Sequence, residues 1–167
     1  AGTGGRAATF VSTDKTGNWS AAATWDGGSA PPYDANFKAT ADADIDIPGS
    51  SGSVTANVEY YYGGRVLTLD IAAGNTLTLA KSFTVNNFNN DGVIQSAGTP
   101  SFRLDAGTHI NTGIIQATSG NGLDFSYGGS QTITNTGIQP ANPLETLPNT
   151  MPRKAEIIPR KRDAIKI

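Results

Sequence analysis

The chain has 167 residues, of which 20 are glycine and 16% are charged, with one histidine and no cysteine. This length suits a single core with an appendage, the missing cysteines exclude disulfides and thiolate metal sites, and no apolar run is long enough for a transmembrane helix. The net charge of −2 divides into −5 over residues 1–139 and +3 over residues 140–167. Abundant Gly, Thr, Asn and Ser predict an all-β fold, and the uneven charge predicts a basic interaction arm.

The first 40 residues contain no repeat and hold both tryptophans, Trp19 and Trp25. Stacked repeats need a segment that covers their first exposed end, and two large aromatic rings suit that role. We therefore predict that residues 1–40 form an N-terminal cap.

Strand signals begin at Asp42, where carboxylates alternate with apolar residues up to Ile47. Alternation with period two places the acids on one face of a strand and the apolar residues on the other. Further strands are expected at residues 53–58, 65–70, 75–79, 82–86, 93–95, 102–105, 110–116, 123–126 and 132–134.

A short phrase occurs three times, as Asn90-Asp-Gly-Val-Ile-Gln95, Asn111-Thr-Gly-Ile-Ile-Gln116 and Asn135-Thr-Gly-Ile-Gln139. Its copies start 21 and 24 residues apart, and recurrence at such an interval indicates a solenoid. A β-sandwich has no reason to repeat one phrase at a fixed long interval. We therefore predict a short parallel β-helix of about four to five coils over residues 41–139.

The repeated residues have structural chemistry. Asn90, Asn111 and Asn135 are expected to form an asparagine ladder, in which amides bond from coil to coil. The glycines are expected to turn the chain within each copy. These are Gly92, Gly113 and Gly137.

The last 28 residues contain five prolines and no apolar periodicity, which excludes a regular helix or a central strand. We predict an extended basic arm over residues 140–167 that binds an acidic protein surface, such as that of another copy in a homo-oligomer. Nucleic acid is disfavoured as a partner because no aromatic residue lies between the basic ones. The expected contact residues are Arg153, Lys154, Arg160, Lys161 and Arg162, with Ile165 and Ile167 at alternate positions of a final strand.

The leader Gly17-Asn-Trp-Ser-Ala-Ala-Ala-Thr-Trp-Asp-Gly-Gly28, followed by a proline and by the coils Leu67-Thr-Leu69 and Leu77-Thr-Leu79, resembles β-helical proteins of phage virions and bacterial surfaces. The resemblance covers roughly residues 15–139 and implies right-handed parallel coils. The basic tail resembles, more loosely, the capsid-crossing arms of phage cement proteins. The same coils serve adhesins, tailspikes and polysaccharide lyases, so the resemblance specifies fold better than function.

Asp42, Asp44 and Asp46 are weak candidates for a calcium site, because calcium takes six to eight oxygen ligands. An EF-hand loop would need Gly at position 47 and Glu at position 53, where this chain has Ile and Ser. A solvated strand face that discourages edge pairing is the favoured interpretation.

A polysaccharide lyase would need acidic calcium ligands and an Arg or Lys base, and the chain lacks the paired-Asp and Gly-His-Gly signatures of polygalacturonases. We therefore expect no catalytic residue and no cofactor. The side chains that an enzyme would have available are Arg65, Lys81 and Arg103, with Asp70, Asp105 and Asp124.

Two further features concern single side chains. His109 has no second histidine to act with and is expected at the surface or in a turn. Tyr60, Tyr61 and Tyr62 are adjacent, so an extended segment would expose one or two of their rings for sugar stacking or a subunit interface, with packing in the cap as the alternative.

Together these features predict a non-enzymatic structural protein on a virion surface, a phage capsid decoration or cement protein that binds other structural subunits and no membrane. One alternative is a secreted bacterial or archaeal adhesin or extracellular filament subunit whose final strand completes a neighbour's sheet. A weaker alternative is a polysaccharide lyase or hydrolase.

Overall fold

The computed structural model describes residues 7–13, 16–49, 52–98, 100–118, 124–128 and 131–137, and every structural statement below concerns these residues. Their regular structure is β-strand apart from one turn of 3-10 helix, η1 (Ala22–Thr24). The strands are β1 (Ala8–Val11), β2 (Gly17–Asn18), β3 (Ala43–Ile47), β4 (Ser53–Ala56), β5 (Val66–Ile71), β6 (Thr76–Leu79), β7 (Phe83–Asn90), β8 (Val93–Ser96), β9 (Ser101–Leu104), β10 (Gly107–Asn111), β11 (Ile114–Ala117), β12 (Asp124–Tyr127) and β13 (Gln131–Asn135).

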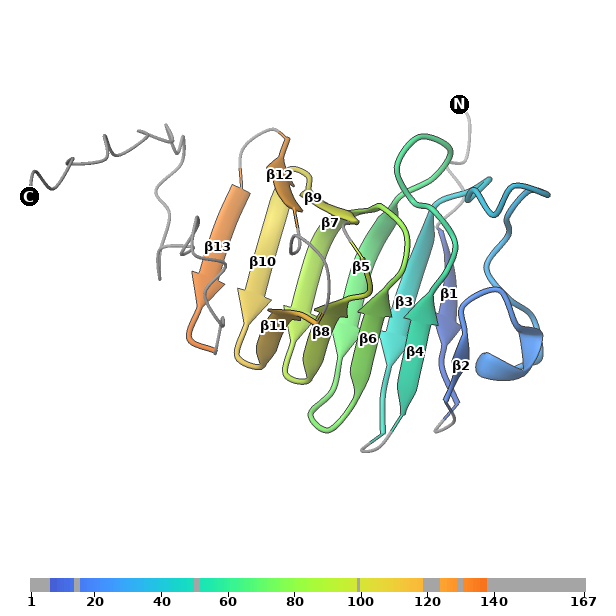
Figure 1. Ribbon diagram of the computed structural model, residues 1–167, viewed down its shortest axis with the longest axis horizontal. Coiled ribbons are helices and arrows are strands. Elements are labelled where there is room, and N and C mark those ends of the chain that lie inside the picture. The colour runs from blue at the N-terminus through green and yellow to red at the C-terminus, as the bar shows by residue number, and fades with distance from the viewer. Residues whose placement is uncertain are drawn as a thin grey trace, which may run out of the picture.

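The strands stack into a β-solenoid of about four turns, which confirms the parallel β-helix (Figure 1). One sheet has the order β1-β3-β5-β7-β10-β13, and the other has the order β2-β4-β6-β8-β11. Every pairing between these strands is parallel. We call them the long sheet and the short sheet.

A third side of the coil is built mainly from β9 and β12. The first half of β7 pairs with β9 and its second half pairs with β10. The single strand β7 is therefore followed by two strands in the next coil. Toward the N-terminal end, parallel bridges join Lys38 to Glu59 and Tyr60 to Phe83 on this side.

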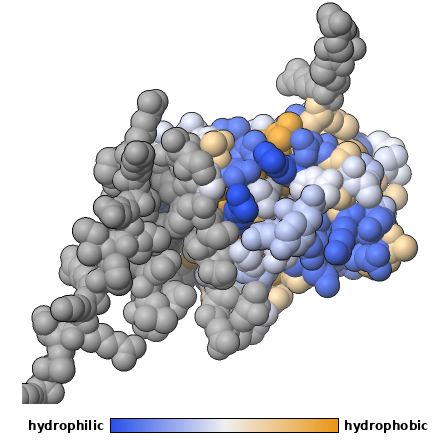
Figure 2. All heavy atoms as spheres, turned by 90° about the horizontal axis from the view of Figure 1, so that it is seen from above, coloured by the Kyte–Doolittle hydropathy of each residue, from blue (hydrophilic) through white to orange (hydrophobic). Residues whose placement is uncertain are grey.

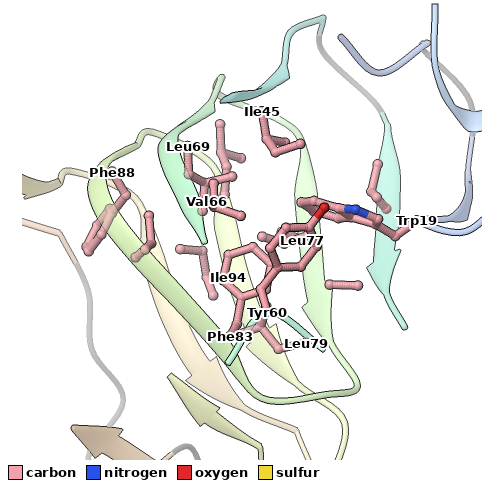
Figure 3. Close-up of a cluster of buried hydrophobic side chains, with 14 of the residues drawn as sticks. Trp19, Ile45, Tyr60, Val66, Leu69, Leu77, Leu79, Phe83, Phe88 and Ile94 are labelled. Carbon is pink, nitrogen blue, oxygen red and sulfur yellow. The ribbon is translucent and has the colours of Figure 1, made fainter. Parts of the chain in front are cut away.

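Alternation of burial along most strands produces the core, and it is interrupted in β5 and β7. In β3, Ala43, Ile45 and Ile47 are buried, while Asp44 and Asp46 point outward. Because parallel strands in register bring like positions together, inward residues of successive coils stack into continuous apolar columns (Figure 3). Each fully buried Leu, Ile, Val or Phe stabilises the fold by roughly 1.5–3 kcal/mol relative to an exposed side chain.

An aromatic column fills one corner of this core. Trp19, Tyr60 and Phe83 are in mutual contact, with ring centroids 5.5 Å apart in every pair (Figure 3). Phe83 lies 6.2 Å from Phe102 in the next coil. Trp25 packs edge-on against Trp19 at 5.0 Å. The tryptophans of the leader therefore belong to the same core as the coils.

The leader also extends both sheets. β1 pairs with β3 in the long sheet, and β2 pairs with β4 in the short sheet. The segment that we expected to act as a cap thus supplies the first strand of each sheet, and η1 and the loop to residue 42 follow it.

Two strand predictions were wrong in their bounds. The single strand expected over residues 110–116 is divided into β10 and β11 by a bend at Thr112 and Gly113, and β7 continues four residues beyond the predicted end at Asn86. The bend exists because the asparagine before it points into the core, while the residues after it begin another side of the coil. The predicted arm, residues 140–167, lies outside the described residues.

Candidate functional surfaces

The asparagine ladder is present in the core. Asn90 Nδ2 donates to Asn111 Oδ1 at 2.7 Å, and Asn111 Nδ2 donates to Asn135 Oδ1 at 2.8 Å. All three side chains are buried. Below the ladder, the position of Asn90 is taken by Ile71 in the long sheet, so the ladder begins at β7. Its role is to hold three coils in register.

The glycines of the repeat stack directly on one another at the following corner. A Cβ atom on Gly113 would collide with the carbonyl oxygen of Gly92, and one on Gly137 would collide with that of Gly113. Ile114 N donates to that same Gly92 oxygen at 2.8 Å. Glycine is therefore required here by the close approach of two backbones.

The predicted acidic face is found on the outside of the long sheet. Asp44 and Asp46 point outward from β3, and Asp46 pairs in register with Asp70 of β5. Partial burial, and then the nearby carboxylates of Asp46, Asp44 and Asp91, raise the pKa of Asp70 above its usual range. Further negative charge on this face is therefore electrostatically unfavourable.

Asp42 does not join Asp44 and Asp46 as a third ligand. It precedes β3 and accepts a hydrogen bond from Arg65 N at 2.8 Å, which fixes the entry to β5. Within the described ranges, no three His, Cys, Asp or Glu side chains gather closely enough to hold a metal ion.

The side chains that an enzyme would use are divided between surfaces. Asp105 receives Arg65 at 3.4 Å and Arg103 at 3.5 Å, so two of the cations share one carboxylate. Asp70 lies on the outer face of the long sheet, and Lys81 is exposed in the turn after β6. Asp124 begins β12. Arg65 and Asp105 come from different coils, and their pairing ties those coils together.

The expectation for His109 was wrong. Its side chain is fully buried in β10, where its ring lies 5.1 Å from that of Phe88, and its Nε2 lies 3.0 Å from the carbonyl oxygen of Asp105. Burial holds the pKa of His109 below its usual range. The register aligns His109 with Phe88 of β7, a buried apolar residue, and with position 133 of β13.

The three adjacent tyrosines separate into two environments. Tyr60 is part of the aromatic column, and its burial raises the pKa of its hydroxyl to about 12. The expectation of an interaction role therefore does not hold for Tyr60, which has no accessible surface. Tyr61 and Tyr62 pack edge-on at 4.6 Å, and Tyr62 is 83% exposed.

A second exposed aromatic pair, Tyr33 and Phe37, was missed in the sequence. Their rings stack at 5.4 Å with an interplanar angle of 9°, and they are 37% and 43% exposed. Together with Tyr61 and Tyr62 they are termed the aromatic patch. Seen from above, the described surface is mostly hydrophilic or neutral, with a few hydrophobic residues among them (Figure 2).

The backbone places the two pairs beside each other. Glu59 N donates to Phe37 O at 2.8 Å, and Ala39 N donates to Glu59 O at 2.9 Å. The loop that carries Tyr61 and Tyr62 therefore runs alongside the segment that follows Phe37, at the N-terminal end of the third side.

Phe37 has a strained backbone, with φ of 57°. Left-handed conformations cost most residues roughly 1–2 kcal/mol, and a bulky residue there is a true outlier. A tight turn imposes it: Asn36 N and Lys38 N both donate to Asp34 Oδ1, at 2.8 and 3.0 Å. Such strain persists where the surroundings enforce it, often at binding sites.

The predicted contact residues of the arm lie outside the described residues, so the structure gives them no surroundings. They are Arg153, Lys154, Arg160, Lys161, Arg162, Ile165 and Ile167. No helix in the described part of the chain has the length and apolar character needed to cross a membrane.

Comparisons with known proteins give this chain no relative. No family model matches it, no curated protein matches its sequence, and no solved structure matches it. The resemblance of the leader and repeat to β-helical virion and surface proteins stays a prediction from the sequence.

Proposed function

We propose that this protein is a non-enzymatic structural component of a phage virion, a capsid decoration or cement protein whose residues 140–167 bind neighbouring subunits. A β-solenoid is consistent with a structural or surface protein, which is the general class of this proposal. The finer assignment is supported by the use that the chain makes of its repeat.

The observation that carries the proposal is that the described asparagine, glycine and glutamine residues of the repeat make contacts between coils. The asparagines bond to one another in the core, the glycines stack at the corner, and Gln116 Nε2 donates to Gln95 Oε1 at 3.2 Å on the outside of the short sheet. The repeat therefore builds a rigid scaffold, and binding is left to the surfaces that do not repeat.

Charge supports a role for the C-terminal residues. The body is acidic, with Asp44, Asp46 and Asp70 on one face, whereas residues 140–167 carry a net charge of +3. Opposite charges on body and tail favour contact between copies, or with another acidic subunit.

Deletion of residues 140–167 tests the proposal. We expect the shortened chain to unfold at the same denaturant concentration as the full chain, because the core and both sheets are built from earlier residues. We also expect it to be absent from the assembled particles that contain the full chain, as measured by co-sedimentation and gel analysis of purified particles. Incorporation of the shortened chain at the normal level would exclude the arm as the attachment.

Location distinguishes the virion from the cell surface. Antibodies against the body, used in immunogold labelling of negatively stained material from the producing cells, are expected to mark phage shells. Labelling of cell-surface filaments or of the envelope alone would favour an adhesin or filament subunit instead.

A further inference from the structure

The aromatic patch of Tyr33, Phe37, Tyr61 and Tyr62 lies outside the hydrophobic core. We infer that it binds the proline-rich segment that starts at Pro140 of a second copy of this chain. This inference rests on the proposed function, because it names the surface on which the arm of a neighbour docks.

Chain chemistry identifies the occupant. Residues 140–143 read Pro-Ala-Asn-Pro, and further prolines follow at 148, 152 and 159. Proline-rich segments adopt the extended polyproline II helix and dock on surfaces lined by aromatic rings, at low entropic cost. The body thus presents four aromatic rings, and the same chain supplies a ligand that suits them.

Backbone contacts place both ring pairs beside the same residue. Tyr33 forms an antiparallel bridge with Ala39, and a Cβ atom on Gly63, the residue after the tyrosine pair, would collide with the carbonyl oxygen of Ala39. The two pairs therefore meet at Ala39, where one extended segment can contact both. Polyproline II rises about 3.1 Å per residue, so Pro140 and Pro143 are about 9 Å apart along such a segment.

The charges leave recognition of the first prolines to the rings. Asp34, Lys38 and Glu59 lie beside the patch, so its surroundings carry both signs. The segment 140–152 carries a single charge, that of Glu145. The first basic residue, Arg153, follows Pro143 by ten positions, or about 31 Å along polyproline II.

The position of the patch favours a second copy. The patch lies at the N-terminal end of the solenoid, whereas the described chain ends at residue 137 just after β13, the last strand of the long sheet (Figure 1). Six strands of that sheet span about 24 Å. Pro140, only three residues beyond the described chain, cannot return over this height to its own patch, because three residues reach about 10 Å. It can reach the patch of a copy stacked on that end.

The first test measures self-association of the full chain by sedimentation equilibrium. Tyr62→Ser and Phe37→Asn are each expected to raise the dissociation constant at least tenfold. Ile114→Ser removes a comparable apolar side chain from the outside of the short sheet, and is expected to change it less than twofold. Equal effects of all three variants, or a wild-type chain that stays monomeric, would overturn the inference.

Phe37→Asn also separates binding from folding. Asparagine tolerates a positive φ better than phenylalanine, so this variant should melt at the same temperature as wild type or higher while it associates more weakly. A lower melting temperature with unchanged association would assign Phe37 to the fold and overturn its role as a receptor.

The ligand is tested by Pro140→Ala combined with Pro143→Ala. These two changes together should weaken association as much as Tyr62→Ser does. The triple variant, which combines them with Tyr62→Ser, should associate hardly more weakly, because the proline changes and the tyrosine change remove the same contact. Additive losses would show two separate contacts and contradict the inference.

Cross-linking identifies which copy binds. A benzoyl-phenylalanine at position 62, in a mixture of ¹⁴N-labelled and ¹⁵N-labelled full chains, is expected to give mixed-isotope cross-links to residues 138–152. Cross-links within one chain only, or to other residues, would overturn the inference. So would patch variants that associate normally yet lose retention on a polysaccharide gel.

The particle assay distinguishes a wrong docking site from a wrong role for residues 140–167. If deletion of residues 140–167 abolishes incorporation into particles and the patch variants do not, the arm is the attachment and its receptor lies elsewhere.

Discussion

At the residue scale, buried asparagine side chains bond to different partners in different coils. Asn90, Asn111 and Asn135 bond to one another, whereas Asn75 bonds to the backbone of the preceding coil, accepting from Gly52 N at 2.8 Å and donating to the carbonyl of Gly49 at 3.0 Å. A buried amide must find partners, and where no amide lies above or below, the backbone supplies them.

Replacement of the central ladder residue should therefore be costly. Asn111→Ala removes two amide bonds and leaves buried groups of its two neighbours without partners, so we expect a loss of about 2–4 kcal/mol in the free energy of unfolding. Urea denaturation measures this loss. Asn89→Ala, at an outward position of β7, is the control and should cost under about 1 kcal/mol. Similar losses for both would show that the ladder adds nothing beyond ordinary packing.

His109 predicts a pH dependence. Because its folded pKa lies below that of the unfolded chain, about 6.5, the unfolded state binds more protons as the pH falls below this value. Stability is therefore fully present above about pH 6.5 and decreases on acidification, with a slope of up to about 1.4 kcal/mol per pH unit.

Unfolding curves between pH 7.5 and 5 measure this slope. His109→Leu should remove it, since leucine suits an inward position beside Phe88 and the chain has no other histidine. The same slope in both proteins would assign the pH dependence to the carboxylates.

At the element scale, the spacing of the coils is set by the corner glycines as much as by the sheets. Gly92, Gly113 and Gly137 bring successive backbones close enough that a methyl group cannot fit between them. β8 and β11 then start in register, with Val93 opposite Ile114.

Gly113→Ala should therefore destabilise the protein more than a backbone conformational penalty alone would. Gly98, with φ of 96° and open space around its Cβ position, provides the matched control. Gly98→Ala should cost about 1 kcal/mol from backbone strain. Gly113→Ala should cost at least about 2 kcal/mol more, because two coils must separate. Thermal denaturation compares them, and equal losses would contradict the steric account.

At the scale of the whole molecule, the solenoid is a short stack with two ends. Stability in such a stack is the sum of contacts between neighbours, and the terminal sheet edges offer unpaired backbone groups unless something covers them. The leader adds its own strands and two tryptophans at one end. The inferred docking of a second copy would bring another chain to the other end and would link copies end to end.

The sequence alone determined the architecture, because a parallel β-helix brings equivalent positions of a repeat into contact. The interval between copies of the asparagine phrase therefore reports the length of a coil, and the alternation after Asp42 reports which side chains face inward. The ladder and the inward pairs such as Phe83 with Val85 followed from these two periods.

Only the tertiary structure decided the features that depend on which segments outside the repeat meet. His109 looked like a surface residue because polarity says nothing about register, and its register placed it in an apolar column. Tyr60 differed from Tyr62 because Trp19, 41 residues earlier, covers it. Tyr33 and Phe37 came together with the tyrosine loop through backbone pairing between residues 37–39 and 59, which no local pattern encodes. Repeated contacts are visible in sequence because they recur, whereas a binding surface that occurs once is defined by long-range packing.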